Sequence, residues 1–115
     1  MAPTESWIDD WQIDVSPPME VARSRELLLI FQQFWQWAGL NEKSKSAQRK
    51  YHAGLHALGG WSVEKLLDGT AAPNVQQLLL EATQAGEEPL IFPDNEVWQG
   101  ELDTVCRKLH KFLRS

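Results

Sequence analysis

YHAGLHALGGW, residues 51–61, is the stretch that decides how this chain folds. It combines two histidines four residues apart with several small residues, and it closes on the glycine pair Gly59 and Gly60. A glycine pair can end a helix, or it can let another segment approach the backbone closely. We therefore expect the second main helix to begin near Ser44 or Ser46, to run through this stretch, and to be bent or broken at the pair.

Three further main helices are expected around this one. Apolar residues cover about half the circumference of residues 18–38, and Arg25 and the glutamines lie opposite them. Asn74 can cap a third helix over residues 75–85, and a last helix should begin after Asp94 or Asn95. Spacings of four and three, typical of a lengthwise packing seam, relate its residues Trp98, Leu102, Val105, Leu109 and Phe112.

The first 17 residues form an N-terminal arm whose conformation the pattern leaves open. A helix would place Trp7, Ile8 and Trp11 on one face, whereas a strand would align Trp11 with the apolar residues two and four positions later. The two tryptophans either dock on the protein's own core or reach a neighbouring subunit. Ser16, followed by two prolines, is expected to cap the next helix.

Composition restricts the class of protein. A chain of 115 residues fits one domain, so we expect a single helical domain over residues 1–115: an all-α bundle of four main helices with a broken second helix. The net charge of -5 disfavours a sequence-independent nucleic-acid binder. The lone cysteine, Cys106, excludes an intramolecular disulfide and is expected in the core.

Charge and hydropathy patterns predict no membrane partner. The N-terminus is acidic where a signal peptide would be basic, and apolar runs fall short of the roughly 20 residues that cross a bilayer. A reducing compartment is permitted by the cysteine count. We therefore expect a cytoplasmic protein.

His52 and His56 are the residues most suggestive of chemistry. On a helix, side chains four residues apart leave from the same side, so both imidazoles could bind one metal ion. A metal site needs at least a third ligand, and neither a zinc-protease signature nor a di-iron pattern accompanies the pair. We favour half-buried, hydrogen-bonded histidines and expect no cofactor.

Ala53, Ala57 and Gly60 form a stripe of small residues on the same helix. Another backbone could approach this stripe closely. If the approaching helix belongs to the same chain, the stripe is a packing surface; if it belongs to a second copy, the stripe is a dimer interface.

Six tryptophans, at positions 7, 11, 35, 37, 61 and 98, are more than a chain of this size readily covers. Tryptophan is enriched where interfaces carry most of their binding energy. We therefore expect some of the six to line an interface or a pocket.

Two other classes of function are weaker predictions. The sequence has no nucleophile elbow, phosphate loop or dinucleotide fingerprint, so we expect no enzymatic activity. Residues 62–80 could form a helix-turn-helix that presents Asn74, Gln76 and Gln77 to DNA bases. Basic residues for phosphate contacts are nearly absent there, which makes nucleic-acid binding a lesser alternative.

The leading hypothesis is a non-enzymatic protein that acts through protein–protein contacts and forms a homodimer. The alternative is a helical bundle that binds a small apolar or metal ligand in a pocket bordered by Trp35, Trp37, Tyr51, His52, His56 and Trp61. Candidate interface or pocket residues are Trp7, Trp11, Trp35, Trp37, Tyr51, Ala53, Ala57, Gly60 and Trp61.

Overall fold

The computed structural model describes residues 1–68 and 74–115, and among these residues it contains helices and no strand. The elements are α1 (Ser6–Asp10), α2 (Pro17–Trp37), the short 3-10 helix η1 (Leu40–Glu42), α3 (Lys45–Leu67), α4 (Val75–Ala82) and α5 (Glu96–Leu113). The predicted all-α bundle of four main helices is confirmed.

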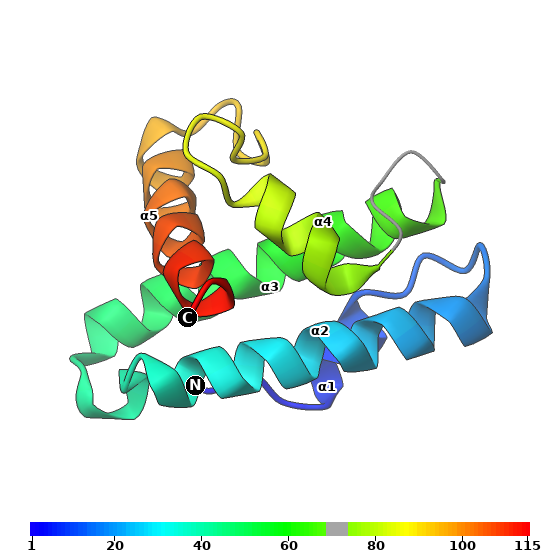
Figure 1. Cartoon of the computed structure of the whole chain (residues 1–115), viewed down its shortest axis with the longest axis horizontal. Coiled ribbons are helices and arrows are strands. Elements are labelled where there is room, and N and C mark those ends of the chain that lie inside the picture. Colours follow the sequence, from blue (N-terminus) through cyan, green and yellow to red (C-terminus); the bar gives the residue numbers. More distant parts are fainter. Residues whose placement is uncertain (69–73) are drawn as a thin grey trace.

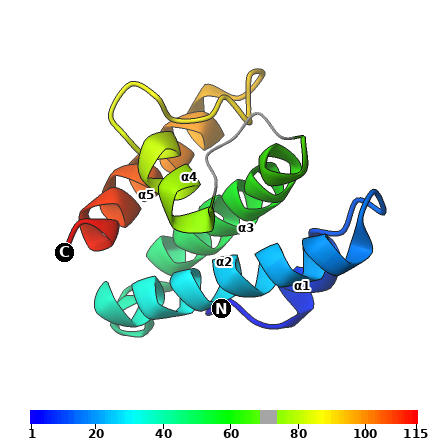
Figure 2. The ribbon, with the colours of Figure 1, turned by 45° about the vertical axis from the view of Figure 1, so that its right-hand side comes forward.

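Helix α3 lies at the centre of the arrangement. It makes its most extensive contacts with α5 and with α2, and it also contacts α4. The long helices α2 and α3 run beside one another in opposite directions, whereas α5 crosses α3 steeply (Figures 1 and 2). Helix α1 packs on α2, so the N-terminal arm belongs to the same body as the bundle.

The glycine pair does not break the second main helix. Helix α3 is continuous from Lys45 to Leu67, and neither Gly59 nor Gly60 has a positive φ, so the expected break is wrong. A Cβ on Gly59 would overlap the indole of Trp11. The glycines therefore form a seat on which the Trp11 ring lies directly against the helix backbone, and this burial offsets the weak helix propensity of glycine.

The N-terminal arm docks on the protein's own core. Trp7 and Trp11 are both at most 3% exposed, and their rings meet edge to face with centroids 5.7 Å apart. The indole N–H of Trp11 donates a hydrogen bond to the carbonyl of His56 at 2.9 Å. Of the two forms that the sequence allowed, the structure adopts the helix, which places Trp7, Ile8 and Trp11 on one buried face.

The buried core is built from one face of each main helix. Trp35, Phe31 and Leu27 of α2 are at most 1% exposed. The seam predicted for α5 is present in its middle but not at its ends, because Trp98 is 57% exposed and Phe112 is only partly buried. The buried part of that helix consists of Leu102, Val105, Cys106 and Leu109.

A buried carboxylate joins the arm to α2. The Ser16 side chain makes no capping hydrogen bond, so the capping role expected of it is wrong. Instead, the Glu20 carboxylate accepts hydrogen bonds from the backbone N–H groups of four consecutive residues, 13–16. Burial raises the pKa of Glu20, but these four donors outweigh it and hold the pKa below its ordinary value of 4.5.

Replacing Glu20 with glutamine is expected to destabilise the protein at neutral pH and to leave it less sensitive to acid. An amide accepts through one oxygen only, and its NH2 group would face N–H donors. Because the Glu20 pKa is lowered on folding, its contribution is fully present above pH 4.5 and is lost as the pH falls through the lowered folded-state pKa. Urea unfolding of wild type and variant at pH 7 and pH 3 measures the difference in unfolding free energy at each pH.

The matched control is Glu26→Gln, since Glu26 is exposed and pairs with Arg23 one turn away. Its effect should stay within roughly 0.5 kcal/mol. A difference between Glu20→Gln and wild type that is the same at both pH values would contradict the role assigned to the Glu20 carboxylate.

Candidate functional site

Two neighbouring hollows lie along α3, and together we call them the α3 groove. The first, of about 250 Å³, lies between α3 and the first turns of α5. The second, of about 730 Å³, lies between α3 and the N-terminal arm. Ala53 and Phe92 line both hollows, and Ala57 lines the second.

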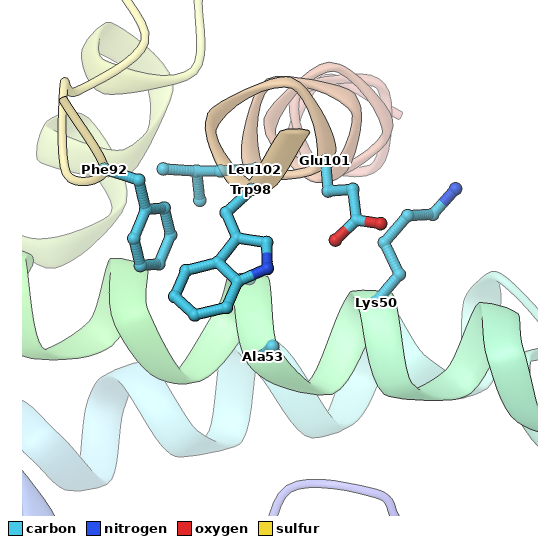
Figure 3. Close-up of a pocket in the computed structure, with 7 residues that line it drawn as sticks. Lys50, Ala53, Phe92, Trp98, Glu101 and Leu102 are labelled. Carbon is cyan, nitrogen blue, oxygen red and sulfur yellow. The ribbon is translucent and has the colours of Figure 1, made fainter. Parts of the chain in front are cut away.

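The smaller hollow, which we call the aromatic pocket, is drawn in Figure 3. Its floor is the α3 backbone at Ala53 and Gly54, and its walls are Phe92, Trp98 and Leu102. The rings of Phe92 and Trp98 meet edge to face with centroids 5.6 Å apart. Lys50 and Glu101 stand at the side away from Phe92.

Glycine sets the depth of the aromatic pocket. A Cβ on Gly54 would lie 2.8 Å from Cγ2 of Val105, which is closer than two carbon atoms pack. The absence of a side chain therefore lets α3 and α5 cross at close range beneath the pocket. The floor is consequently backbone and a single methyl group, that of Ala53.

Gln99 holds Phe92 in place. Its amide oxygen accepts hydrogen bonds from the backbone N–H groups of Ile91 and Phe92, at 3.1 and 3.0 Å. Its amide nitrogen donates to the carbonyl of Pro89 at 2.9 Å. One side chain of α5 thus supplies the partners that the proline-flanked segment before the helix cannot find in regular structure. The sequence predicted an extended segment here but gave no signal for this clamp.

His52 and His56 fasten the N-terminal arm to α3. Nδ1 of His52 donates to the carbonyl of Met1 at 2.7 Å, and Nε2 of His56 lies 3.0 Å from a carboxylate oxygen of Asp10. The Trp7 ring meets both imidazoles edge to face, with centroid distances of 4.9 and 5.1 Å. In the part of the chain that the structure describes, no group of three potential metal ligands is present. The hydrogen bonds and ring contacts of the two histidines hold the arm on α3.

The six tryptophans fall into three groups by exposure. Trp7, Trp11 and Trp35 are buried in their own chain, and the Trp35 indole donates to Asn41 at 2.8 Å. Trp61 is half-buried, and Lys65 lies 5.8 Å over its ring. Trp37 and Trp98 are exposed by 46% and 57%. Of the six tryptophans, which the sequence indicated to be more than the chain could cover, two are therefore left exposed.

The aromatic pocket differs from the one expected from the sequence. His52 and His56 line the larger hollow, but Trp35, Trp37, Tyr51 and Trp61 line neither hollow of the groove. Trp37 instead stacks on Phe34 at the C-terminal end of α2. Trp98, Phe92 and Glu101 were not among the expected pocket residues, although an aromatic residue in the first turn of a helix is a usable signal.

The stripe of small residues divides between two neighbours. Gly60 faces the Trp11 ring of the same chain. A Cβ added at Gly60 would lie 3.5 Å from that ring. Ala53 is exposed and Ala57 is half-buried, and both lie on the α3 groove. One end of the stripe is therefore covered by the arm, while the other end is open.

Cys106 is a core residue, as expected. It is 0% exposed, and burial, helped by the negative charges of Glu88 and Asp103, raises its pKa to about 12. The thiol is therefore protonated at pH 7, and the protonated form is the less reactive one. His110 is held by Thr83, with Nδ1 and Oγ1 3.0 Å apart.

The helix-turn-helix alternative gains no support from the described residues. Its turn, residues 69–73, lies outside them. Gln76 and Gln77 are exposed on α4, but that helix carries no basic residue to contact a phosphate. Among the residues that the structure describes, no helix combines the length and the apolar character needed to cross a bilayer.

The residues brought together on α3 form one hollowed surface. The α3 groove offers an aromatic wall, a small-residue floor and charged side chains at its margins. Comparison with known proteins adds no family: no protein-family model, curated protein or solved structure matches this chain.

Proposed function

We propose that this protein is a non-enzymatic interaction protein of the cytoplasm that forms a homodimer through the α3 groove. The observation that carries the proposal is the position of an exposed Trp98 beside a hollow floored by Ala53 and Ala57. A cytoplasmic location fits the single buried cysteine, which needs no oxidising compartment.

A two-fold axis makes such a surface complementary to itself. In a symmetric dimer each copy presents the same patch. A side chain that projects from one copy can therefore enter the hollow of the other, and the same contact is made in reverse. Trp98 of one copy enters the larger hollow of the other, and the reverse contact closes the dimer. Val97, which is 69% exposed, extends the apolar area beside Trp98.

Charge at the margins of the groove supports an antiparallel arrangement. Lys50 stands at one end, and Asp10 stands at the other, beside His56. An axis that passes between Ala53 and Ala57 brings Lys50 of each copy toward Asp10 of the other. Complementary charge of this kind favours the correct register and speeds association.

The small residues of α3 set how closely the second copy can approach. Ala53 and Ala57 present only methyl groups, so a large ring can lie near the helix backbone. Tryptophan is one of the residues enriched among those that carry most of the binding energy at interfaces. Any longer side chain at Ala57 would fill the hollow that Trp98 is proposed to occupy.

Replacing Ala57 with arginine is expected to abolish dimerisation. Size-exclusion chromatography with light scattering should give twice the 13.1 kDa chain mass for the wild type and 13.1 kDa for the variant at the same concentration. The association constant should fall at least about tenfold, as expected when a charge must be desolvated in an apolar contact. Circular dichroism should show equal helix content in both.

The matched control is Ala22→Arg, an identical change at an exposed alanine of α2. It should leave the dimer intact. A wild type that stays monomeric at about millimolar concentration, or an Ala57→Arg variant that dimerises as tightly as the wild type, would overturn the proposal.

A further inference from the structure

We propose that the aromatic pocket binds a small organic cation, namely an amine with a compact apolar body. The pocket lies within one chain, and because the proposed dimer contact also uses Trp98, the inference is made for the single chain and is tested in the Ala57→Arg variant as well as in the wild type. Three properties carry it: the size of the pocket, the side chains that form its walls, and the orientation of its charged side chains.

Size limits the apolar body. A dry cavity of about 150 Å³ is known to accept benzene, so a hollow of about 250 Å³ accepts roughly six to ten carbon atoms. The walls are Phe92, Trp98 and Leu102, and the floor is Ala53 with the Gly54 backbone. None of these five groups places a charge inside the pocket, so the part of the ligand that enters is apolar.

Two charged side chains of opposite sign, Glu101 and Lys50, line the pocket, and they are oriented differently. Figure 3 shows the Glu101 side chain descending from α5 between Trp98 and Lys50, with its carboxylate toward α3. The Lys50 side chain rises from α3 and ends with its nitrogen directed away from Trp98. Its ammonium lies 5.5 Å from the centroid of the Tyr51 ring. Lys50 therefore directs its ammonium away from Trp98, whereas Glu101 directs its carboxylate toward α3 beside the Trp98 ring.

Aromatic walls reinforce the preference for a cation. The face of an indole ring attracts an ammonium group within about 6 Å of its centre, and tryptophan does so best of the aromatic side chains. An ammonium at the mouth of the pocket would lie between the Trp98 ring and the Glu101 carboxylate. A neutral ligand of the same shape would gain the apolar contact alone, and an anion would meet Glu101.

Titration of the full-length protein with phenethylamine, followed by the NMR signal of the Trp98 indole N–H, tests this inference. Replacing Trp98 with phenylalanine identifies the signal. We expect saturable binding with a dissociation constant on the order of 1 mM, which suits a ligand of this size. Phenethyl alcohol, the neutral analogue, should bind about fivefold more weakly than phenethylamine. The anion 3-phenylpropionate should bind at least as weakly as the alcohol.

Glu101→Gln should weaken phenethylamine binding about fivefold and leave phenethyl alcohol binding unchanged. The matched control is Glu96→Gln, an exposed carboxylate of the first turn of α5 that does not line the pocket. It should change neither affinity.

Three results would overturn the inference: no saturable shift of the Trp98 signal with phenethylamine, equal amine affinity in wild type and Glu101→Gln, or tighter binding of 3-phenylpropionate than of the amine. The Ala57→Arg variant keeps the pocket intact, so binding by this variant separates a failure of the ligand site from a failure of the dimer.

Discussion

Replacing Gly59 with alanine is expected to lower the free energy of unfolding by about 3 kcal/mol, an unusually large effect for one added methyl group. Its Cβ would overlap the indole of Trp11, whose side chain is 2% exposed and hydrogen-bonded to His56. The rigid ring has no free space to enter, so the arm must move away from α3. Urea unfolding monitored by circular dichroism measures the loss.

Gly60→Ala is the matched control for Gly59→Ala. The Cβ at position 60 would meet the Trp11 ring at 3.5 Å, an ordinary contact. Alanine is the better helix former, so this variant should gain about 0.5–1 kcal/mol. Equal effects at the two positions would show that Trp11 does not lie against Gly59.

Replacing Trp11 with alanine is expected to lower the free energy of unfolding by about 3–5 kcal/mol, because it empties the seat on α3 and exposes the core beneath. The Trp11 ring also meets Phe31 at a centroid distance of 6.1 Å, so the loss extends to α2. Trp98→Ala, measured at a concentration too low for association, should cost about 1 kcal/mol or less since that side chain is 57% exposed.

The losses of unfolding free energy caused by Trp11→Ala and Gly59→Ala should not be additive. In a chain that already carries Trp11→Ala, Gly59→Ala has no ring to displace and should become neutral or stabilising. A double-mutant cycle isolates this coupling, which should reach about 3 kcal/mol. Additive losses would mean that the arm and α3 are destabilised separately.

Local signals in the sequence sufficed to predict the four main helices. Asn74 and Asn95 cap α4 and α5, accepting from the N–H groups of Gln77 and Trp98 at 2.8 and 3.0 Å. Capping acts within one turn, so it can be read from neighbouring residues. The role of Gly59 could not be predicted from its neighbours in the sequence. Glycine is the residue expected both where a helix breaks and where a ring packs against a helix backbone. The distinction depends on Trp11, which is 48 positions away in the chain.

The candidate site was less predictable than the helices. Lys50, Phe92 and Glu101 meet only because α5 crosses α3 above Gly54, and no spacing in the sequence encodes that crossing. Trp98 fitted the seam of α5 by its spacing, yet periodicity does not show where along a helix the core ends. The small residues Ala53 and Ala57 were predicted as a contact surface, and the structure places both on the α3 groove.

The most direct test of the proposed dimer is an isotope-filtered nuclear Overhauser experiment on an equal mixture of labelled and unlabelled full-length protein. We predict intermolecular contacts between the Trp98 ring of one copy and the Ala57 methyl group of the other. Because only contacts between copies survive the filter, the arm and core cannot contribute. A dimeric sample in which the Trp98 ring shows no intermolecular contact with Ala57, or a sample that is monomeric throughout, would contradict the account.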